Sequence, residues 1–315
     1  MSKTFAAIGD ISQKASFDQI GPGLYAFSGQ GNPHSGVIIG EDAVMIVDAQ
    51  ATPAIANDLI ACIGRVTDKP VKYVLLTHFH AVRTLGASAF KGAQILASDA
   101  TRGLIAERGR QDMECEIARF PALFMARDGV AGLTWPTITF PDQMSVWLGT
   151  REVRIMHVGR GHTAGDVIAA MPDCGVVFAG DLVTSKAACY CGDAHFTDWP
   201  ATLDNLAEMQ ASTLVPGRGD VLASAEDVKQ AIDETAAFVT TLFASVQDSV
   251  GKGLSLKDTF DAARHVMDAR FKDFTLYDHA LPFSIARAYD EARGVEWPVI
   301  WTVERDREIQ AALQG

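Results

Sequence analysis

Cysteine is scarce in this sequence, and its placement argues against a disulfide framework. Five cysteines occur in 315 residues, an odd number scattered through a long chain, whereas disulfide-stapled folds are short and carry paired cysteines. Only Cys189 and Cys191 lie close together. Thiolates two residues apart can bind a soft metal or act as redox thiols, but the usual two-residue gap is missing. We therefore interpret both as structural or pocket-lining residues.

Positive charge and long apolar runs are also in short supply. The chain has 27 Lys and Arg against 39 Asp and Glu, a formal net charge of −12, so its field repels phosphate backbones and anionic lipid. No apolar run in the sequence approaches the ~20 residues of a membrane span, and its start shows no export signal. We expect a cytoplasmic protein that binds a small-molecule substrate, with no nucleic acid and no membrane as partner.

What the sequence does contain is apolar material for a large core, 48% of its residues, enough for one large domain with or without an appendage. Residues 23–49 are typical of a β-hairpin, residues 53–66 of a helix, and residues 71–77 of a strand buried on both faces. A looser copy of this order follows at 166–219. Two such units predict an α/β fold in which two sheets form a sandwich with helices outside. Between the units we expect a long helix from about residue 99 to residue 126.

The last third of the chain is predicted to be helical. Two capping boxes open helices there, Ser224 with Asp227 and Ser255 with Asp258. Residues 251–253 supply a glycine-rich boundary, which divides the chain into a sandwich domain at 1–250 and a helical C-terminal extension at 251–315. The extension can pack back on the sandwich, form a lid or form the interface of a homodimer.

Histidines at the end of the buried strand predict a metal site. His78 and His80 follow Thr77 directly, and side chains two apart in extended chain point the same way. His162, in a glycine-flanked loop, offers a third imidazole, and Asp181, at the predicted end of a strand, offers a carboxylate. Imidazole and carboxylate are the ligands that zinc takes in catalytic sites. A lone histidine in such a place is more often hydrogen-bonded than ligating. Three histidines and one aspartate together at strand ends or in the loops after them favour a metal.

These segments resemble those of a known family. The segments THFHAVR, GHTAGD and FAGD are similar to the T-H-x-H-x-D-H, G-H-T-x-G-D and aspartate-bearing signatures of the metallo-β-lactamase superfamily. The likeness covers roughly residues 20 to 220. It implies a four-layer αββα sandwich, with His78, His80, His162 and Asp181 as metal ligands.

Three positions depart from the family pattern. Where the family has Asp, His and His at its second metal site, this chain has Val82, Arg83 and Arg218. Valine offers no lone pair, and guanidinium groups repel a dication. We therefore expect one zinc ion, with Arg83 or Arg218, or both, paired with Asp181 where a second ion would lie. The alternative is that both arginines face solvent.

The resemblance implies a mononuclear zinc-dependent hydrolase. Arg83 and Arg218 would bind the anion of a small ester, lactone, thioester or amide, and Asp181 can act as a base only if the arginines leave it free. Two alternatives remain open. One is a mononuclear iron enzyme resembling the persulfide dioxygenases of the same superfamily, and the other is a metal- and anion-binding protein without turnover.

Three further residues are candidates for the pocket. His34 precedes the first predicted hairpin strand, and Asp193 and His195 lie in a segment that resembles a stretch lining the family's active site. Loop residues near a cleft are often simply exposed, so each is equally open to a structural interpretation.

Overall fold

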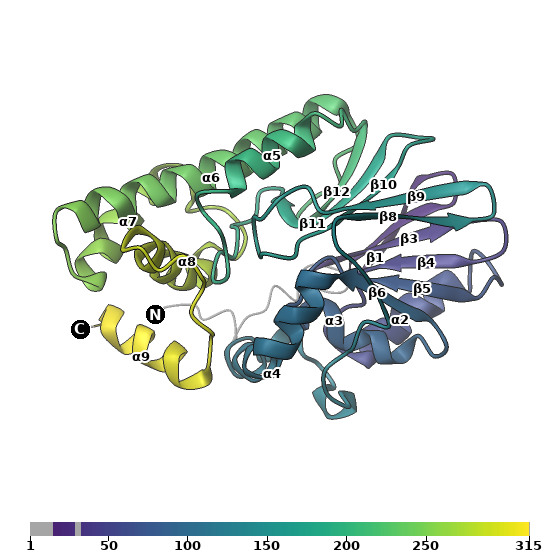
Figure 1. Cartoon of the computed structure of the whole chain (residues 1–315), viewed down its shortest axis with the longest axis horizontal. Helices are drawn as coiled ribbons and strands as arrows, with labels where there is room; N and C mark the ends of the chain where they lie inside the picture. Colours follow the sequence, from purple (N-terminus) through teal and green to yellow (C-terminus); the bar gives the residue numbers. More distant parts are fainter. Residues whose placement is uncertain (1–14, 29–32, 315) are drawn as a thin grey trace.

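The computed structural model describes residues 15–28 and 33–314. Residues 1–14 of the predicted sandwich domain and residues 29–32 of the predicted hairpin region lie outside the described residues. Two stacked sheets form the centre of the molecule, with helices on both outer faces and further helices beyond one end (Figure 1). The predicted α/β class and the four-layer αββα sandwich are confirmed.

The first sheet, as far as the structure describes it, has seven strands in chain order: β1 (Ser16–Gly21), β2 (Leu24–Ser28), β3 (His34–Ile39), β4 (Val44–Val47), β5 (Val71–Leu75), β6 (Gln94–Ser98) and β7 (Ile138–Phe140). The strands from β1 to β4 pair antiparallel, and those from β4 to β7 pair parallel. The parallel half brings the carboxyl ends of several strands to one edge, which is where open α/β sheets bind ligands.

The second sheet has the order β12-β11-β10-β9-β8. Its strands are β8 (Gln143–Leu148), β9 (Arg151–Met156), β10 (Ile168–Met171), β11 (Val176–Thr184) and β12 (Thr213–Arg218). Only β11 and β12 are parallel among these pairs. The sequence predicted Asp181 at the end of this strand, and that prediction is wrong. Asp181 lies inside β11, because the strand continues to Thr184 after a register shift at Gly180.

Helices lie on the outer faces of both sheets and beyond one end of the sandwich. They are α2 (Pro53–Ile63), α3 (Ala81–Thr84), α4 (Asp99–Arg119), α5 (Trp199–Ala207), α6 (Ala225–Gly251), α7 (Leu256–Phe271), α8 (Tyr277–Ala292) and α9 (Val303–Gln314). The predicted caps are present, since the Ser224 and Ser255 hydroxyls accept the N–H groups of Asp227 and Asp258, each at 3.1 Å. The predicted helix to residue 126 is wrong at its end. Phe120 leaves the helical region (φ −126°, ψ 54°) because Pro121 follows it.

One core cluster fills the space between the sheets, and others lie under the helices. Met45, Ile155 and Phe178 belong to the cluster between the sheets. A Cβ on Gly36 would lie 2.5 Å from the Phe178 ring, so glycine is required there for the sheets to approach. The core under α5 and α6 continues into α7 and α8. The boundary at residue 250 thus falls at the end of a helix that packs on both parts, and it stays a prediction.

The C-terminal helices pack on the sandwich. In Figure 1, α9 (yellow) lies beside α4, and the two helices are in contact. Among the described residues, none of the helices combines the length and the apolar character that a membrane span requires.

Candidate metal centre

The turn after β5 presents the first two histidines. His78 and His80 lie between the end of β5 and α3, and both side chains are buried, at 1% and 2% exposure. Two carboxyl groups from α4 hold the start of α3. Asp112 accepts the N–H of Ala81 and Glu116 accepts the N–H of Val82, each at 3.1 Å. These bonds satisfy donors that a helix start leaves unpaired.

His162 completes a cluster of three imidazoles. One ring nitrogen from each of His78, His80 and His162 lies within 4.8 Å of the other two. The ring centroids are 4.9, 4.6 and 4.7 Å apart. The structure thus brings together the three histidines that the sequence predicted as ligands.

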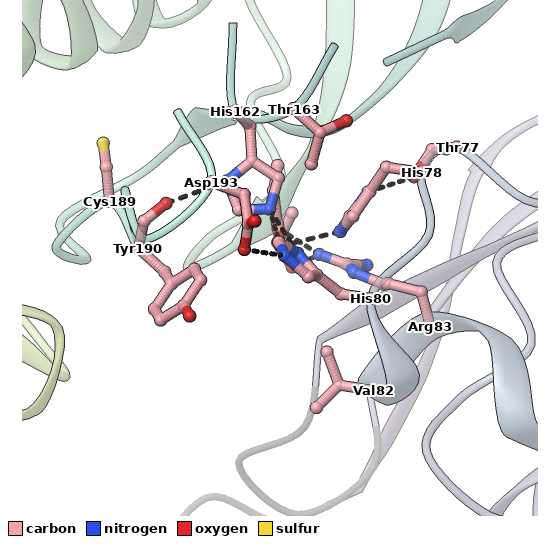
Figure 2. A network of polar contacts seen from close by, with 12 residues as sticks. Thr77, His78, His80, Val82, Arg83, His162, Thr163, Cys189, Tyr190 and Asp193 are labelled. Atoms are coloured by element: carbon pink, nitrogen blue, oxygen red, sulfur yellow. Dashed lines mark hydrogen bonds and ion pairs between the residues drawn. The ribbon is translucent and has the colours of Figure 1, made fainter. Parts of the chain in front are cut away.

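The outward nitrogen of each imidazole is held by the protein. His78 Nδ1 lies 2.9 Å from Thr77 Oγ1, whose proton goes to Asp48 at 2.8 Å. His80 Nε2 lies 3.1 Å from an Asp193 carboxylate oxygen, and His162 Nδ1 lies 2.8 Å from the Tyr190 carbonyl oxygen. Figure 2 shows these contacts radiating from the cluster. All three partners accept a hydrogen bond from an outward ring N–H, so they orient the rings and leave His78 Nε2, His80 Nδ1 and His162 Nε2 facing inward.

These residues fit a cation. His78 Nε2 is buried and has no hydrogen-bond partner among the described residues, which is costly unless something binds it. His80 Nδ1 and His162 Nε2 lie 2.9 Å apart. Three imidazoles aimed at one point, each oriented from behind, make the donor set of a catalytic zinc site once every inward nitrogen is unprotonated.

The charge state of the cluster also matters for binding. Burial lowers the pKa of His78 well below its usual value and that of His162 to about 3. Burial acts the same way on His80, but the carboxylates of Asp112 and Asp193 outweigh it and raise its pKa to about 9. At neutral pH the cluster therefore carries one proton more than three neutral imidazoles would, on His80. The 2.9 Å contact between His80 Nδ1 and His162 Nε2 places this extra proton between the two rings.

Arg83 occupies the place beside Asp181. Its guanidinium donates to the Asp181 carboxylate and to Gly217 O at 3.1 Å, and it lies 3.3 Å from Asp48. Burial would raise the pKa of Asp181, but Arg83 holds it well below its usual range. Asp181 is thus a permanent anion, 3.6 and 3.5 Å from His78 Nε2 and His162 Nε2, and not a base at neutral pH.

The two arginines have different surroundings. Arg83 is 1% exposed, and its Nη1 also donates to His34 O at 2.7 Å. Both terminal nitrogens of its guanidinium therefore donate to groups of the protein. Arg218 lines a cavity next to the imidazoles, with an accessible volume of about 60 Å³. Its other lining residues are His80, Val82, Glu116, Phe120, Leu123, His162, Asp181, Thr184, Ala188, Tyr190, Leu276, His279 and Ala280. Of the two guanidinium groups, that of Arg218 lines the cavity and that of Arg83 does not.

Of the three further candidates, only Asp193 contacts one of the three clustered histidines. His34 lies behind Arg83, with its Nδ1 2.9 Å from Pro216 O. His195 packs its ring against Trp297, with centroids 5.6 Å apart, and burial lowers its pKa to about 4. Neither ring lines the cavity formed by the described residues.

Asp112 and Glu116 are site residues that sequence reasoning missed. Their spacing of four on a predicted helix places both on one face, but nothing in the sequence directs that face to His80. They could share an ion with His80 by distance, yet His80 Nε2 is committed to Asp193 and both carboxyl groups bond backbone N–H groups. Burial raises the pKa of Asp112 to about 7 and that of Glu116 well above its usual value.

Cys189 and Cys191 fit the structural interpretation. Both thiols are buried. Burial raises the pKa of Cys189 to about 12 and that of Cys191 well above its usual value. Reactive and metal-binding cysteines need the thiolate, which these surroundings disfavour.

Comparisons with known proteins agree with this fold. A family model described as the metallo-beta-lactamase superfamily matches residues 28–218. A metallo-beta-lactamase type 2 from Bacillus sp. (strain 170) is 24% identical over 201 residues, 62% of this chain and 70% of that protein. A linear primary-alkylsulfatase from a Pseudomonas species is 21% identical over 251 residues, 68% of this chain and 46% of that protein. A solved metallo-beta-lactamase from Pontibacter korlensis has a TM-score of 0.57 at 19% identity, over 72% of this chain and 99% of that chain, a likeness of fold.

Zinc binding should release about one proton at pH 7, because His80 must lose its proton before Nδ1 can bind. Since the pKa of His80 is raised to about 9, zinc affinity should increase by up to about tenfold per pH unit from pH 6 to 8. Calorimetry in buffers of different ionisation enthalpy measures the proton count. A flat affinity between pH 6 and 8 with no proton released would contradict this charge state.

Proposed function

The chain belongs to the metallo-β-lactamase superfamily, and on that premise we propose that it is a hydrolase that uses a single zinc ion held by His78, His80 and His162. The observation that carries this proposal is the set of three inward ring nitrogens whose outward partners are all occupied. Zinc held by three imidazoles polarises a carbonyl and lowers the pKa of water at its open position.

A single ion is supported by the surroundings of Asp181. The Arg83 guanidinium, a cation, fills the space beside this carboxylate. Val82 offers no ligand atom, and it stands apart from the dashed contacts in Figure 2. Asp181 has its charge balanced by Arg83 and would lie beside a zinc ion held by the three histidines.

The cavity supports an anionic substrate with an apolar part. Arg218 remains a cation although burial lowers its pKa to about 10. Phe120, Leu123 and Leu276 supply apolar walls, which favour a hydrocarbon group. We therefore propose a small anionic ester, lactone, thioester or amide as substrate. One relative is named an alkylsulfatase, so alkyl sulfates belong among the compounds to test.

Glu116 is the carboxyl group that can move a proton in this cavity. It lines the cavity, and burial raises its pKa well above the usual value, which favours the protonated form. Its oxygen bonds the N–H of Val82, the position where the family has an aspartate side chain. We assign to Glu116 the donation of a proton to the leaving group.

The proposed function predicts hydrolysis of at least one anionic ester, lactone, thioester, amide or alkyl sulfate by the zinc-loaded protein, abolished by a chelator and restored by zinc. Metal analysis of protein purified without added metal should find about one zinc per chain. Iron together with oxygen uptake would instead indicate the dioxygenase, and full zinc occupancy without turnover of any compound would indicate a binding protein.

Arg218→Met should raise KM for an anionic substrate by about 10- to 100-fold, since a hydrogen bond to a charged group contributes about 1.5–3 kcal/mol. The neutral methyl ester or amide of the same compound serves as the control, and its KM should barely change. Equal effects on the charged and the neutral compound would remove Arg218 from anion binding.

Glu116→Gln should lower kcat by about 100-fold or more with little change in KM. The amide keeps the size of the side chain and the oxygen that accepts the Val82 N–H, but it is not an acid and cannot protonate the leaving group. Zinc content measured on the same sample separates this effect from loss of metal. An unchanged kcat at full zinc occupancy would exclude Glu116 as the proton donor.

A further inference from the structure

The loop between β11 and α5 carries two of the groups that orient the histidines. We call residues 188–197 the support loop. The Tyr190 carbonyl oxygen in this loop holds His162, and the Asp193 carboxylate holds His80. In Figure 2 these two residues approach the imidazoles from one side. The position of the support loop therefore sets the direction of two of the three inward nitrogens.

The residues between these two groups are held by the C-terminal helical extension. The Cys191 N–H donates to Ser284 Oγ on α8 at 3.2 Å. The Trp301 indole N–H donates to Gly192 O at 2.9 Å. A Cβ on Gly192 would lie 2.8 Å from that indole nitrogen, so Trp301 packs directly on the loop backbone. Tyr190 and Asp193 thus flank two residues whose backbone bonds end in the last 65 residues of the chain, residues 251–315.

The rest of the support loop is also held by the C-terminal extension. Arg287 donates to Ala194 O at 2.8 Å, and Glu291 accepts the Phe196 N–H at 3.1 Å. These side chains are mostly buried, since Arg287 and Glu291 are 1% and 11% exposed and pair with each other at 2.7 Å. Buried polar contacts of this kind fix a backbone in one arrangement when every member is satisfied.

Asp193 has a second connection to the same extension. Its other carboxylate oxygen accepts from Arg108 Nη1 at 3.1 Å, and the same nitrogen donates to Pro298 O at 3.1 Å. The Trp297 ring lies over this guanidinium, 5.6 Å from the centroid. A continuous line of contacts therefore runs from His80 through Asp193 and Arg108 to residues 297–298.

We propose that the C-terminal extension is part of the metal centre, in which Ser284 and Trp301 are positioning residues that fix the support loop and through it the imidazoles of His80 and His162. This inference rests on the metal site of the proposed function and not on hydrolysis. Partners that orient metal ligands from behind contribute about 10- to 100-fold to metal affinity. An extension that only covered the sandwich would contribute to stability and leave metal affinity unchanged.

The test is a matched pair of serine variants in the full chain. Ser284 and Ser249 are both buried in helices, and both donate to the carbonyl oxygen four residues earlier, at 2.8 and 3.0 Å. Ser284 also accepts the Cys191 N–H and lies 3.3 Å from Cys189 O. Ser284→Ala should weaken Co²⁺ binding by about tenfold or more and change the visible spectrum of bound Co²⁺, which reports ligand geometry. Ser249→Ala should leave both within about twofold of wild type by the same reasoning.

A second variant and the melting temperature of the metal-free proteins complete the design. Trp301→Phe keeps an aromatic ring but removes the indole donor. It should weaken Co²⁺ binding as predicted for Ser284→Ala, and it provides the test if Ser284→Ala does not fold. Equal Co²⁺ affinity and spectra for wild type and the folded variants at positions 284 and 301 would overturn the inference. Wild-type protein that binds no Co²⁺ would overturn both this inference and the proposed function. Wild-type protein that binds Co²⁺ but shows no turnover at full zinc occupancy would overturn the proposed function alone.

Discussion

Three imidazoles with committed outward nitrogens are the constraint around which this structure is organised. Desolvation keeps His78 and His162 neutral, and acceptors behind each ring turn the remaining lone pairs toward a common point. Packing lone pairs together in a buried site is unfavourable unless a cation joins them. The proton on His80 partly meets this need, and a metal ion bound by all three nitrogens meets it fully. The strand ends, the start of α3, the support loop and the C-terminal helices all serve to hold these rings.

Arg83 and Asp181 determine what kind of metal site this is. In this buried ion pair the Arg83 guanidinium neutralises the Asp181 carboxylate, which weakens the attraction of that carboxylate for a second dication. Arg83 is in turn held by Asp48, which also accepts the Thr77 hydroxyl behind His78. The Asp48 carboxylate thereby contacts both the cationic side and the imidazole side of the site.

The sequence predicted the parts of this site that depend on local spacing. His78 and His80 follow a buried strand, so their common direction is given by the period of the backbone, and His162 lies in a motif that is similar to one of a known family. The pairing of Arg83 with Asp181 followed from charge. The roles of Asp193, Glu116, Ser284 and Trp301 did not, because they depend on contacts between segments up to 190 residues apart, as between Arg108 and Pro298. The sequence prediction did not include strand β8, although Val146 and Leu148 alternate with exposed residues. It also extended α4 beyond Phe120, although Pro121 disfavours a helical conformation at the residue before it.

The most direct test of this account is a crystal structure of the zinc-loaded protein with an anomalous difference map at the zinc absorption edge. The account predicts a single peak within bonding distance of His78 Nε2, His80 Nδ1 and His162 Nε2, at about 2.0–2.1 Å, with Arg83 still paired with Asp181. Two neighbouring peaks, or a single peak at Asp181 with Arg83 displaced and the imidazoles turned away, would contradict it.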